Sequence, residues 1–296
     1  MTRRYRSLEN TVFDTAVLLL MVLMGLLCLL PLLHIISLSL SSKTAALAGR
    51  VYIWPVELTV TPYKTLLQDA KFMQAMWVSV QRVVLGGLIN FALTICCAYP
   101  LSLETKQFPA RRVYIWVFVF AMLFGAGIVP WYFVIKSTGL IDSIWALVLP
   151  GGLPVYNMIL LMNFFRNEPA AIKEAATIDG VGQFQMMTRI YVPLAMPAIA
   201  TVTVFSIVGH WNNFFDGLLL INSPSKIPLQ TYIQTLTNTN IVITSSSMTE
   251  EELAALTSLK TFNAAKIVVA ALPIAIFYPF MQRFFVSGIS LGSVKG

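Results

Sequence analysis

Six long uncharged stretches constrain this chain more than any other feature of its sequence. A helix that crosses a bilayer needs roughly 20 apolar residues, because the hydrocarbon core is about 30 Å thick and each helical residue rises about 1.5 Å. The stretches are residues 15–42, 83–103, 113–135, 143–165, 190–215 and 267–282. The last is short, but Lys266 and Arg283 can extend their charged ends to the two interfaces. The sequence therefore predicts an all-α, polytopic membrane protein with six transmembrane helices.

Composition and charge agree with a single membrane domain over residues 1–296. Hydrophobic residues make up 57% of the chain and charged residues 11%, whereas soluble domains carry about 25% charged residues. The net charge of +7 is spread over short segments between the apolar runs, so no basic patch points to nucleic acid. No internal repeat or separate soluble domain is visible. The three cysteines lie within apolar runs and are interpreted as small hydrophobic residues.

The distribution of basic residues predicts the orientation in the membrane. Six spans place both termini on the same side. If that side is the cytoplasm, eleven Lys and Arg residues lie inside and eight outside, and the inside loops are the shorter ones. We therefore expect a multi-pass membrane protein with both termini cytoplasmic and a cytosolic tail at about 284–296.

Two segments on the predicted external side are long, at about 43–81 and 221–263. In the first, Thr61 and Pro62 predict the N-cap and first position of a helix that runs into the second span. In the second, Thr249 and Glu252 fit a capping box. A solvated connector and a docking surface for an external partner are equally compatible with both segments.

Common catalytic and energy-coupling motifs are missing. The chain contains no G-x-x-x-x-G-K-[ST] phosphate loop, no H-E-x-x-H and no G-x-S-x-G. His34 and His210 are its only histidines and are far apart, so no metal site and no cofactor are expected in this chain. Asp14 and Asp216 fall at span ends, where we expect water to reach them. If the chain takes part in transport, the energy should therefore come from a partner.

The loop at about 166–190, between the fourth and fifth spans, carries the strongest motif. Pro169 at the first position and Gly180 just past the end predict a short helix of about eleven residues. Ala171, Ala175 and Ile178 share one face of it at spacings of four and three. A low-profile alanine face lets a neighbouring protein approach closely. The alternative is an ordinary solvated connector.

This loop resembles the EAA signature of ABC importer permeases. The matching residues are Glu174, Ala175, Ala176, Asp179, Gly180, Ile190 and Pro193. Val192 stands where the family usually has Leu. Over nearly its full length the chain is similar to the second permease subunit of maltose-type and complex-oligosaccharide importers. The similarity includes Gly139-Leu140, the stretch from Ala146 to Pro150, Asn163-Phe164-Phe165, Trp211-Asn212 and the ending 288–296.

The resemblance implies a type I ABC importer permease fold and a set of partners. The loop helix would be the coupling helix, seated in a groove of a cytosolic ATPase, and the tail after Arg283 would reach toward the ATPase dimer interface. The implied partners are a sister permease, the ATPase dimer and an extracytoplasmic solute-binding protein. ATP and Mg²⁺ would bind to the ATPase, and this chain would not be an enzyme. The implied cargo is an oligosaccharide, and the implied location is the bacterial plasma (inner) membrane.

Polar residues in or near the spans are candidates for the substrate path. They are Arg82, Asn90, Asn157, His210, Trp211, Asn212 and Asn213. Asn side chains within a span need partners, and an aromatic ring beside them suits the apolar face of a sugar. The alternatives are an aromatic belt at the outer interface and hydrogen bonds between helices. Arg82 and His210 would suit an acidic saccharide.

Two other functional classes stay open. A secondary carrier needs an ion site on broken helices within the membrane, and Gly151-Gly152-Leu153-Pro154 is the one break that the sequence indicates. A membrane-embedded enzyme or a purely structural subunit is the second rival.

Overall fold

The computed structural model describes residues 8–244 and 259–279, and the regular structure in these residues is helical. The chain divides into two compact units. The first comprises residues 1–69 and 237–271, and the second comprises residues 70–236 and 272–296. The predicted all-α fold is confirmed. The capping box at Thr249 and the tail after Arg283 lie outside the described residues.

The membrane-crossing helices are of two kinds. Three unbroken helices are long and apolar enough to cross a bilayer: Thr11–Ser39, Ala70–Ser102 and Leu259–Pro279. Three further candidates are bent pairs: Arg111–Leu123 with Ile128–Ser137 at 114°, Ile144–Gly151 with Val155–Arg166 at 43°, and Gln183–Leu194 with Met196–Asn212 at 85°. The count reaches six when each bent pair is one span.

The bends occur where the backbone cannot continue a regular helix. Gly127, between the first two bent segments, has φ +81°, a value that glycine adopts without steric cost. Pro154 precedes the second segment of the next pair. Pro197 occupies the first turn of the helix that begins at Met196, where proline is tolerated. The sequence reading indicated only the break at 151–154, so the other two are new findings.

The first unit contains α1 (Leu8–Ser39), α2 (Lys43–Leu47) and α3 (Thr61–Gln68). The prediction that Thr61 caps α3 is wrong by one position. Thr61 is the first helical residue, Val60 is the N-cap without a side-chain bond, and the N–H of Thr61 donates to Thr59 Oγ1 at 3.2 Å. The helix also stops before the second span, because Asp69 is extended at ψ 98°.

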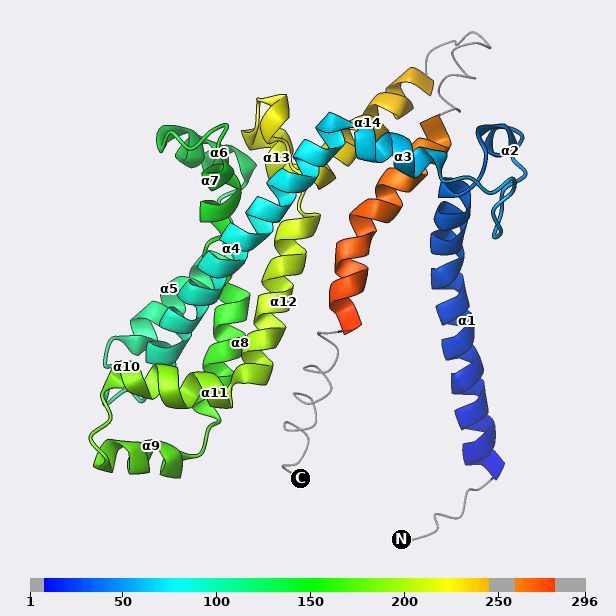
Figure 1. The fold of residues 1–296 in the computed structure, drawn as a ribbon. Coiled ribbons are helices and arrows are strands. Elements are labelled where there is room, and N and C mark those ends of the chain that lie inside the picture. The colour runs from blue at the N-terminus through cyan, green and yellow to red at the C-terminus, as the bar shows by residue number, and fades with distance from the viewer. Residues whose placement is uncertain (1–7, 245–258, 280–296) are drawn as a thin grey trace. The chain divides into compact units, whose positions relative to one another are not determined.

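The second unit is built around α4 (Ala70–Ser102), with α8 (Val155–Arg166) and α12 (Met196–Asn212) packed against it (Figure 1). Tyr99, Phe165 and Tyr191 meet edge to face at the centre of its core, with ring centroids 5.2–6.4 Å apart. Their contact joins α4, α8 and the segment that follows α9 (Ala170–Ile178). This core therefore fixes one end of the bundle, the end at which α9 lies.

The opposite end of the second unit carries α6 (Ile128–Ser137), α7 (Ile144–Val148) and α13 (Phe215–Leu220) (Figure 1). Asp142, before α7, ties this end together. Its carboxylate accepts from the N–H groups of Asn222 at 3.0 Å and Ser223 at 2.8 Å, from the Ser223 hydroxyl at 2.6 Å and from Lys226 Nζ at 2.9 Å. These bonds, led by the Ser223 hydroxyl, hold the pKa of Asp142 well below its ordinary value.

Candidate coupling loop and transport cavity

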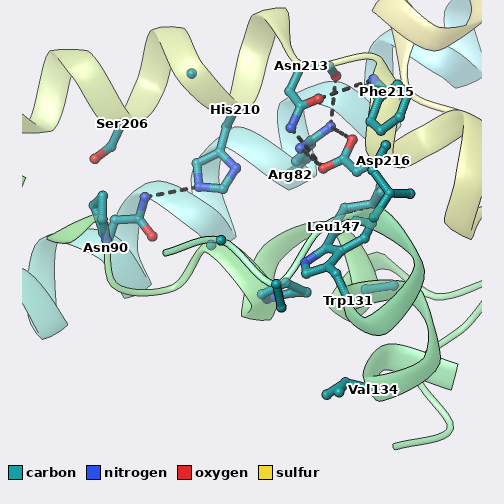
Figure 2. Close-up of a pocket in the computed structure, with 18 of the residues that line it drawn as sticks. Arg82, Asn90, Trp131, Val134, Leu147, Ser206, His210, Asn213, Phe215 and Asp216 are labelled. Carbon is teal, nitrogen blue, oxygen red and sulfur yellow. Dashed lines mark hydrogen bonds and ion pairs between the residues drawn. The ribbon is translucent and has the colours of Figure 1, made fainter. Parts of the chain in front are cut away.

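A cavity of about 930 Å³ opens in the second unit among α4, α6, α7, α8, α12 and α13. Its wall carries five of the seven residues predicted for the substrate path, and Figure 2 shows several of them. The five are Arg82, Asn90, Asn157, His210 and Asn213. Trp131, Phe205 and Phe215 supply aromatic surface to the same wall. The structure therefore gathers the five predicted residues from three helices, α4, α8 and α12, and the turn after α12. The passage of a substrate here stays a prediction.

The other two predicted residues point elsewhere. Trp211 is buried and lines a separate, almost wholly apolar cavity of about 640 Å³, formed by α4, α12 and residues 273–278. Asn212 is exposed and does not line either cavity. Successive helical residues lie about 100° apart, because a turn takes 3.6 residues. His210 and Trp211 therefore cannot share one face of α12.

Arg82 forms a buried ion pair with Asp216. Arg82 Nη1 donates to Asp216 Oδ1 at 3.0 Å and to the carbonyl of Asn213 at 2.9 Å, and Nη2 donates to Asp216 Oδ2 (Figure 2). The carboxylate also accepts from Asn213 Nδ2 at 3.1 Å and from the Gly217 N–H at 2.8 Å. Arg82 is 1% exposed and Asp216 is 7% exposed.

This pair corrects two expectations. The prediction that water reaches Asp216 is wrong, because the chain turns at Asn213, with ψ 119°, and brings the carboxylate in α13 onto Arg82 in α4. The suggestion that Arg82 suits an acidic ligand also loses its basis. Its charge is already neutralised within the chain by Asp216.

Asn90 connects α12 to the break before α8. Its amide meets His210 Nε2 at 3.2 Å (Figure 2). With the amide oxygen toward His210, the nitrogen faces the carbonyl oxygens of Gly151 and Gly152 at 3.0 Å and of Gly86 at 3.2 Å. We assign this orientation because it satisfies both ends of the amide. His210 Nε2 then donates to Asn90.

Gly86 makes room for this arrangement. A Cβ atom built on Gly86 would overlap the imidazole of His210, whereas one built on the neighbouring Gly87 would meet only Ile207 Cγ1 at 3.9 Å. The ring of His210 therefore packs directly on the backbone of α4. Sequence reasoning missed Gly86 and Asp216. The sequence did carry a signal for Gly86, because it lies four residues after Arg82 and four before Asn90 along α4.

Asn157 bonds a neighbouring helix. Its Nδ2 donates to the carbonyl of Val202 at 3.1 Å and to Ser206 Oγ at 3.2 Å. This is the helix-to-helix bond that the sequence left as an alternative to a cavity role. Asn157 does both, because it also lines the cavity wall.

The motif between the fourth and fifth predicted spans forms α9 and a tight turn. The helix has nine residues, with Pro169 as N-cap and Asp179 as C-cap, against the eleven expected. Gly180 has φ +73°, and its N–H donates to the carbonyl of Thr177 at 3.1 Å. The left-handed conformation after the last helical residue is one that glycine adopts at little cost.

The signature residues of this loop divide between two environments. Ile178 is 86% exposed, and Ala171, Glu174, Ala175, Asp179 and Gly180 are exposed with it. Ala176 is buried in the core that contains Tyr99, and Tyr99 Oη donates to Gln183 Oε1 at 2.8 Å. Ala176 thus anchors α9 in the core, while the neighbouring Ala175 faces outward.

The last two signature residues follow α9. Ile190 is half-buried against the core within the π-helix Met186–Tyr191. Pro193 is exposed in the short helix Val192–Leu194 that comes next. Before α9, partial burial raises the pKa of Glu168 above its ordinary value. Among the described residues, no group of three or more His, Cys, Asp or Glu side chains could hold a metal ion.

Comparisons with known proteins identify the family. Residues 75–291 match the family described as "Binding-protein-dependent transport system inner membrane component". The chain is 33% identical over 98% of its length to the whole of the polygalacturonan/rhamnogalacturonan transport system permease protein YtcP of Bacillus subtilis (strain 168). It is 35% identical, over 98% of each chain, to protein LplC of the same organism.

A solved structure agrees with these relatives. It is a chain of a bacterial ABC transporter involved in the import of the acidic polysaccharide alginate, with a TM-score of 0.84 and 30% identity over 96% of this chain and 100% of that one. The resemblance to ABC importer permeases is thereby confirmed. This chain belongs to the family of inner membrane components of binding-protein-dependent transport systems, as an ABC transporter permease.

Proposed function

We propose that this permease carries an oligosaccharide across the inner membrane together with a sister permease. The cavity supports this cargo, because it combines hydrogen-bonding side chains with the aromatic rings of Trp131, Phe205 and Phe215. Such a wall suits a molecule with hydroxyl groups and apolar ring faces. The names of the relatives, which concern polygalacturonan, rhamnogalacturonan and alginate, support a saccharide as well.

The energy in this proposal comes from a separate ATPase dimer that binds ATP and Mg²⁺, and this chain has no enzymatic activity of its own. An extracytoplasmic solute-binding protein delivers the saccharide, and both termini are cytoplasmic. The exposed face of α9 is the observation that carries the proposal. Ala171, Ala175 and Ile178 are exposed on α9, at the end of the unit opposite α13. Such a face can transmit motion of an ATPase to the bundle as a rigid-body movement.

The cargo is tested by ATP hydrolysis in the reconstituted transporter. The complex of both permeases and the ATPase is placed in lipid vesicles with its binding protein and a panel of neutral and acidic oligosaccharides, amino acids and peptides. We expect at least one loaded binding protein to stimulate hydrolysis. Stimulation by a class other than saccharides, with none by any saccharide, would refute the proposed cargo.

The coupling role of α9 is tested by Gly180→Val. A β-branched residue is strained at φ +73°, so the helix end should shift while membrane insertion and the cavity stay intact. We expect saccharide-stimulated ATP hydrolysis and uptake to fall at least about tenfold together. Gly182→Val is the matched control, because Gly182 has a negative φ of −70° and open space around it. Normal uptake by an assembled Gly180→Val complex would rule out this role.

A further inference from the structure

The loop between α2 and α3, residues 48–60, runs back beside the last turns of α1 (Figure 1). His34 Nδ1 donates to the carbonyl of Tyr52 at 2.8 Å, and the Ser37 hydroxyl donates to the carbonyl of Ile53. A carbonyl oxygen only accepts, so the proton in the histidine contact lies on Nδ1. Side chains of α1 therefore hold this loop by its backbone.

Polar contacts close the base of the same loop. The Glu57 carboxylate accepts from the hydroxyls of Ser42 and Thr44, and it lies 3.6 Å from Arg50 Nη2. These hydroxyls, led by that of Ser42, hold the pKa of Glu57 below its ordinary value. Glu57 has φ +53°, a conformation that is uncommon for a residue other than glycine and persists where its surroundings fix it. The loop therefore has a defined shape.

The bond to His34 sets the depth of the loop in the bilayer. The apolar helix Thr11–Ser39 has 29 residues, so it is about 43 Å long at about 1.5 Å per residue. The hydrocarbon core is about 30 Å thick, and the bilayer with its headgroups about 40–45 Å. A centred span of this length reaches the outer edge of the headgroups. His34 lies about 7–8 Å before the helix end, which is near the boundary between headgroups and hydrocarbon.

The tip of the loop, residues 52–54, presents large apolar side chains at this depth. Tyr52 is 73% exposed, Ile53 43% and Trp54 80%. Tyr and Trp collect at membrane interfaces, because each ring is apolar while its O–H or N–H can bond to headgroups. Water around the tip would leave this apolar surface hydrated at a cost in free energy. A lipid interface covers it.

We propose that the tip is a preformed anchor that inserts into the lipid interface at the C-terminal end of α1. Its partner is bilayer lipid, with the rings of Tyr52 and Trp54 between the headgroups and the first methylene groups of the acyl chains. In the proposed topology this is the outer leaflet. Interfacial aromatic residues set the tilt of a span, so the anchor fixes how α1 crosses the membrane.

The direct test is photo-crosslinking from the tip in the complete transporter. Both permeases and the ATPase are reconstituted in vesicles of phosphatidylethanolamine and phosphatidylglycerol, with the photoreactive residue benzoylphenylalanine in place of Trp54. After illumination, mass spectrometry of this permease identifies what the new side chain contacts, because the excited ketone reacts with C–H bonds next to it. We expect a mass gain of one phospholipid molecule, with the new bond near the glycerol end of the acyl chain.

Four results would overturn the anchor: an adduct mainly to the sister permease, an adduct mainly to added solute-binding protein, a bond near the methyl end of the acyl chain, or no lipid adduct. If the Trp54 variant does not assemble, benzoylphenylalanine in place of Tyr52 asks the same question with Trp54 intact. Ile178 is the matched control, because it is 86% exposed on α9. Benzoylphenylalanine at that position should give no lipid adduct.

A second measurement tests whether α1 sets the depth of the tip. His34→Leu removes the bond to the Tyr52 carbonyl, so the crosslinks from position 54 should lose their preference for the glycerol end and spread along the acyl chain. Thr15→Val is the control, because it removes a bond to the carbonyl of Thr11 within α1, and it should leave the crosslinks unchanged. The same crosslink positions in both variants would show that His34 does not position the tip.

Discussion

The ion pair between Arg82 and Asp216 allows a quantitative prediction about stability. Arg82→Met leaves a carboxylate that is 7% exposed without its counter-charge. Breaking a buried pair in this way typically costs about 3–5 kcal/mol. Asn213 Nδ2 and the Gly217 N–H still donate to the carboxylate, so we expect the lower end, a loss of about 3 kcal/mol in the free energy of unfolding. The side chains of Arg82 and Asp216 are 2% and 10% exposed, so solvent screening reduces this loss of stability only slightly.

The assay is a double-mutant cycle on the purified complex in detergent, with unfolding followed by denaturant titration. Arg82→Met with Asp216→Leu removes both charges together and should be more stable than Arg82→Met alone, because an apolar pair replaces a buried ion pair at little or no cost. A coupling energy of about 2 kcal/mol or more is expected. Additive effects within about 0.5 kcal/mol would refute the reasoning. Lys226→Met, at a pair that is half exposed, is the control and should have a far smaller effect.

Two further predictions concern other positions. Gly86→Ala should displace the ring of His210 and lower uptake, whereas Gly87→Ala should be nearly neutral, and equal uptake by the two variants would contradict the packing described. Asp142→Ala should loosen the segment that begins at Asn222, measured as faster hydrogen exchange of the Ser223 amide. Because the folded pKa of Asp142 lies below its unfolded value of about 3.9, its stabilisation is present above that pH and is lost only as the pH falls through the folded pKa. If the protection of the Ser223 amide from hydrogen exchange already declined between pH 7 and pH 5, this explanation of the stabilisation by Asp142 would be wrong.

The length of each apolar run predicted the helical membrane fold because the bilayer sets that length. The length of an apolar run carries no information about the direction of the helix axis, so the bends of 114° and 85° were not predicted. The local signals are Gly125 and Gly127 at the first break and Pro193 and Pro197 at the second. Gly and Pro also occur in unbroken spans, as Gly86 and Pro100 do in α4.

The part of the site whose structure depends on local sequence was predictable. Pro169 and Gly180 define α9 by their own backbone preferences, and the structure has a helix between them. Asp216 was misjudged because its burial depends on α13 meeting α4, a contact between residues 134 positions apart. Trp211 was grouped with His210 because they are adjacent in sequence, and the helix turns them into different cavities.

The claim that this permease depends on mechanical work from a separate ATPase is tested most directly by uptake into vesicles. Labelled oligosaccharide is offered to vesicles that contain both permeases, with and without the ATPase subunits, in the presence of the binding protein and internal ATP. We predict uptake only in vesicles with the ATPase and loss of that uptake when ATP is omitted. Uptake that continued without the ATPase and followed an imposed ion gradient would contradict the account and indicate a secondary carrier.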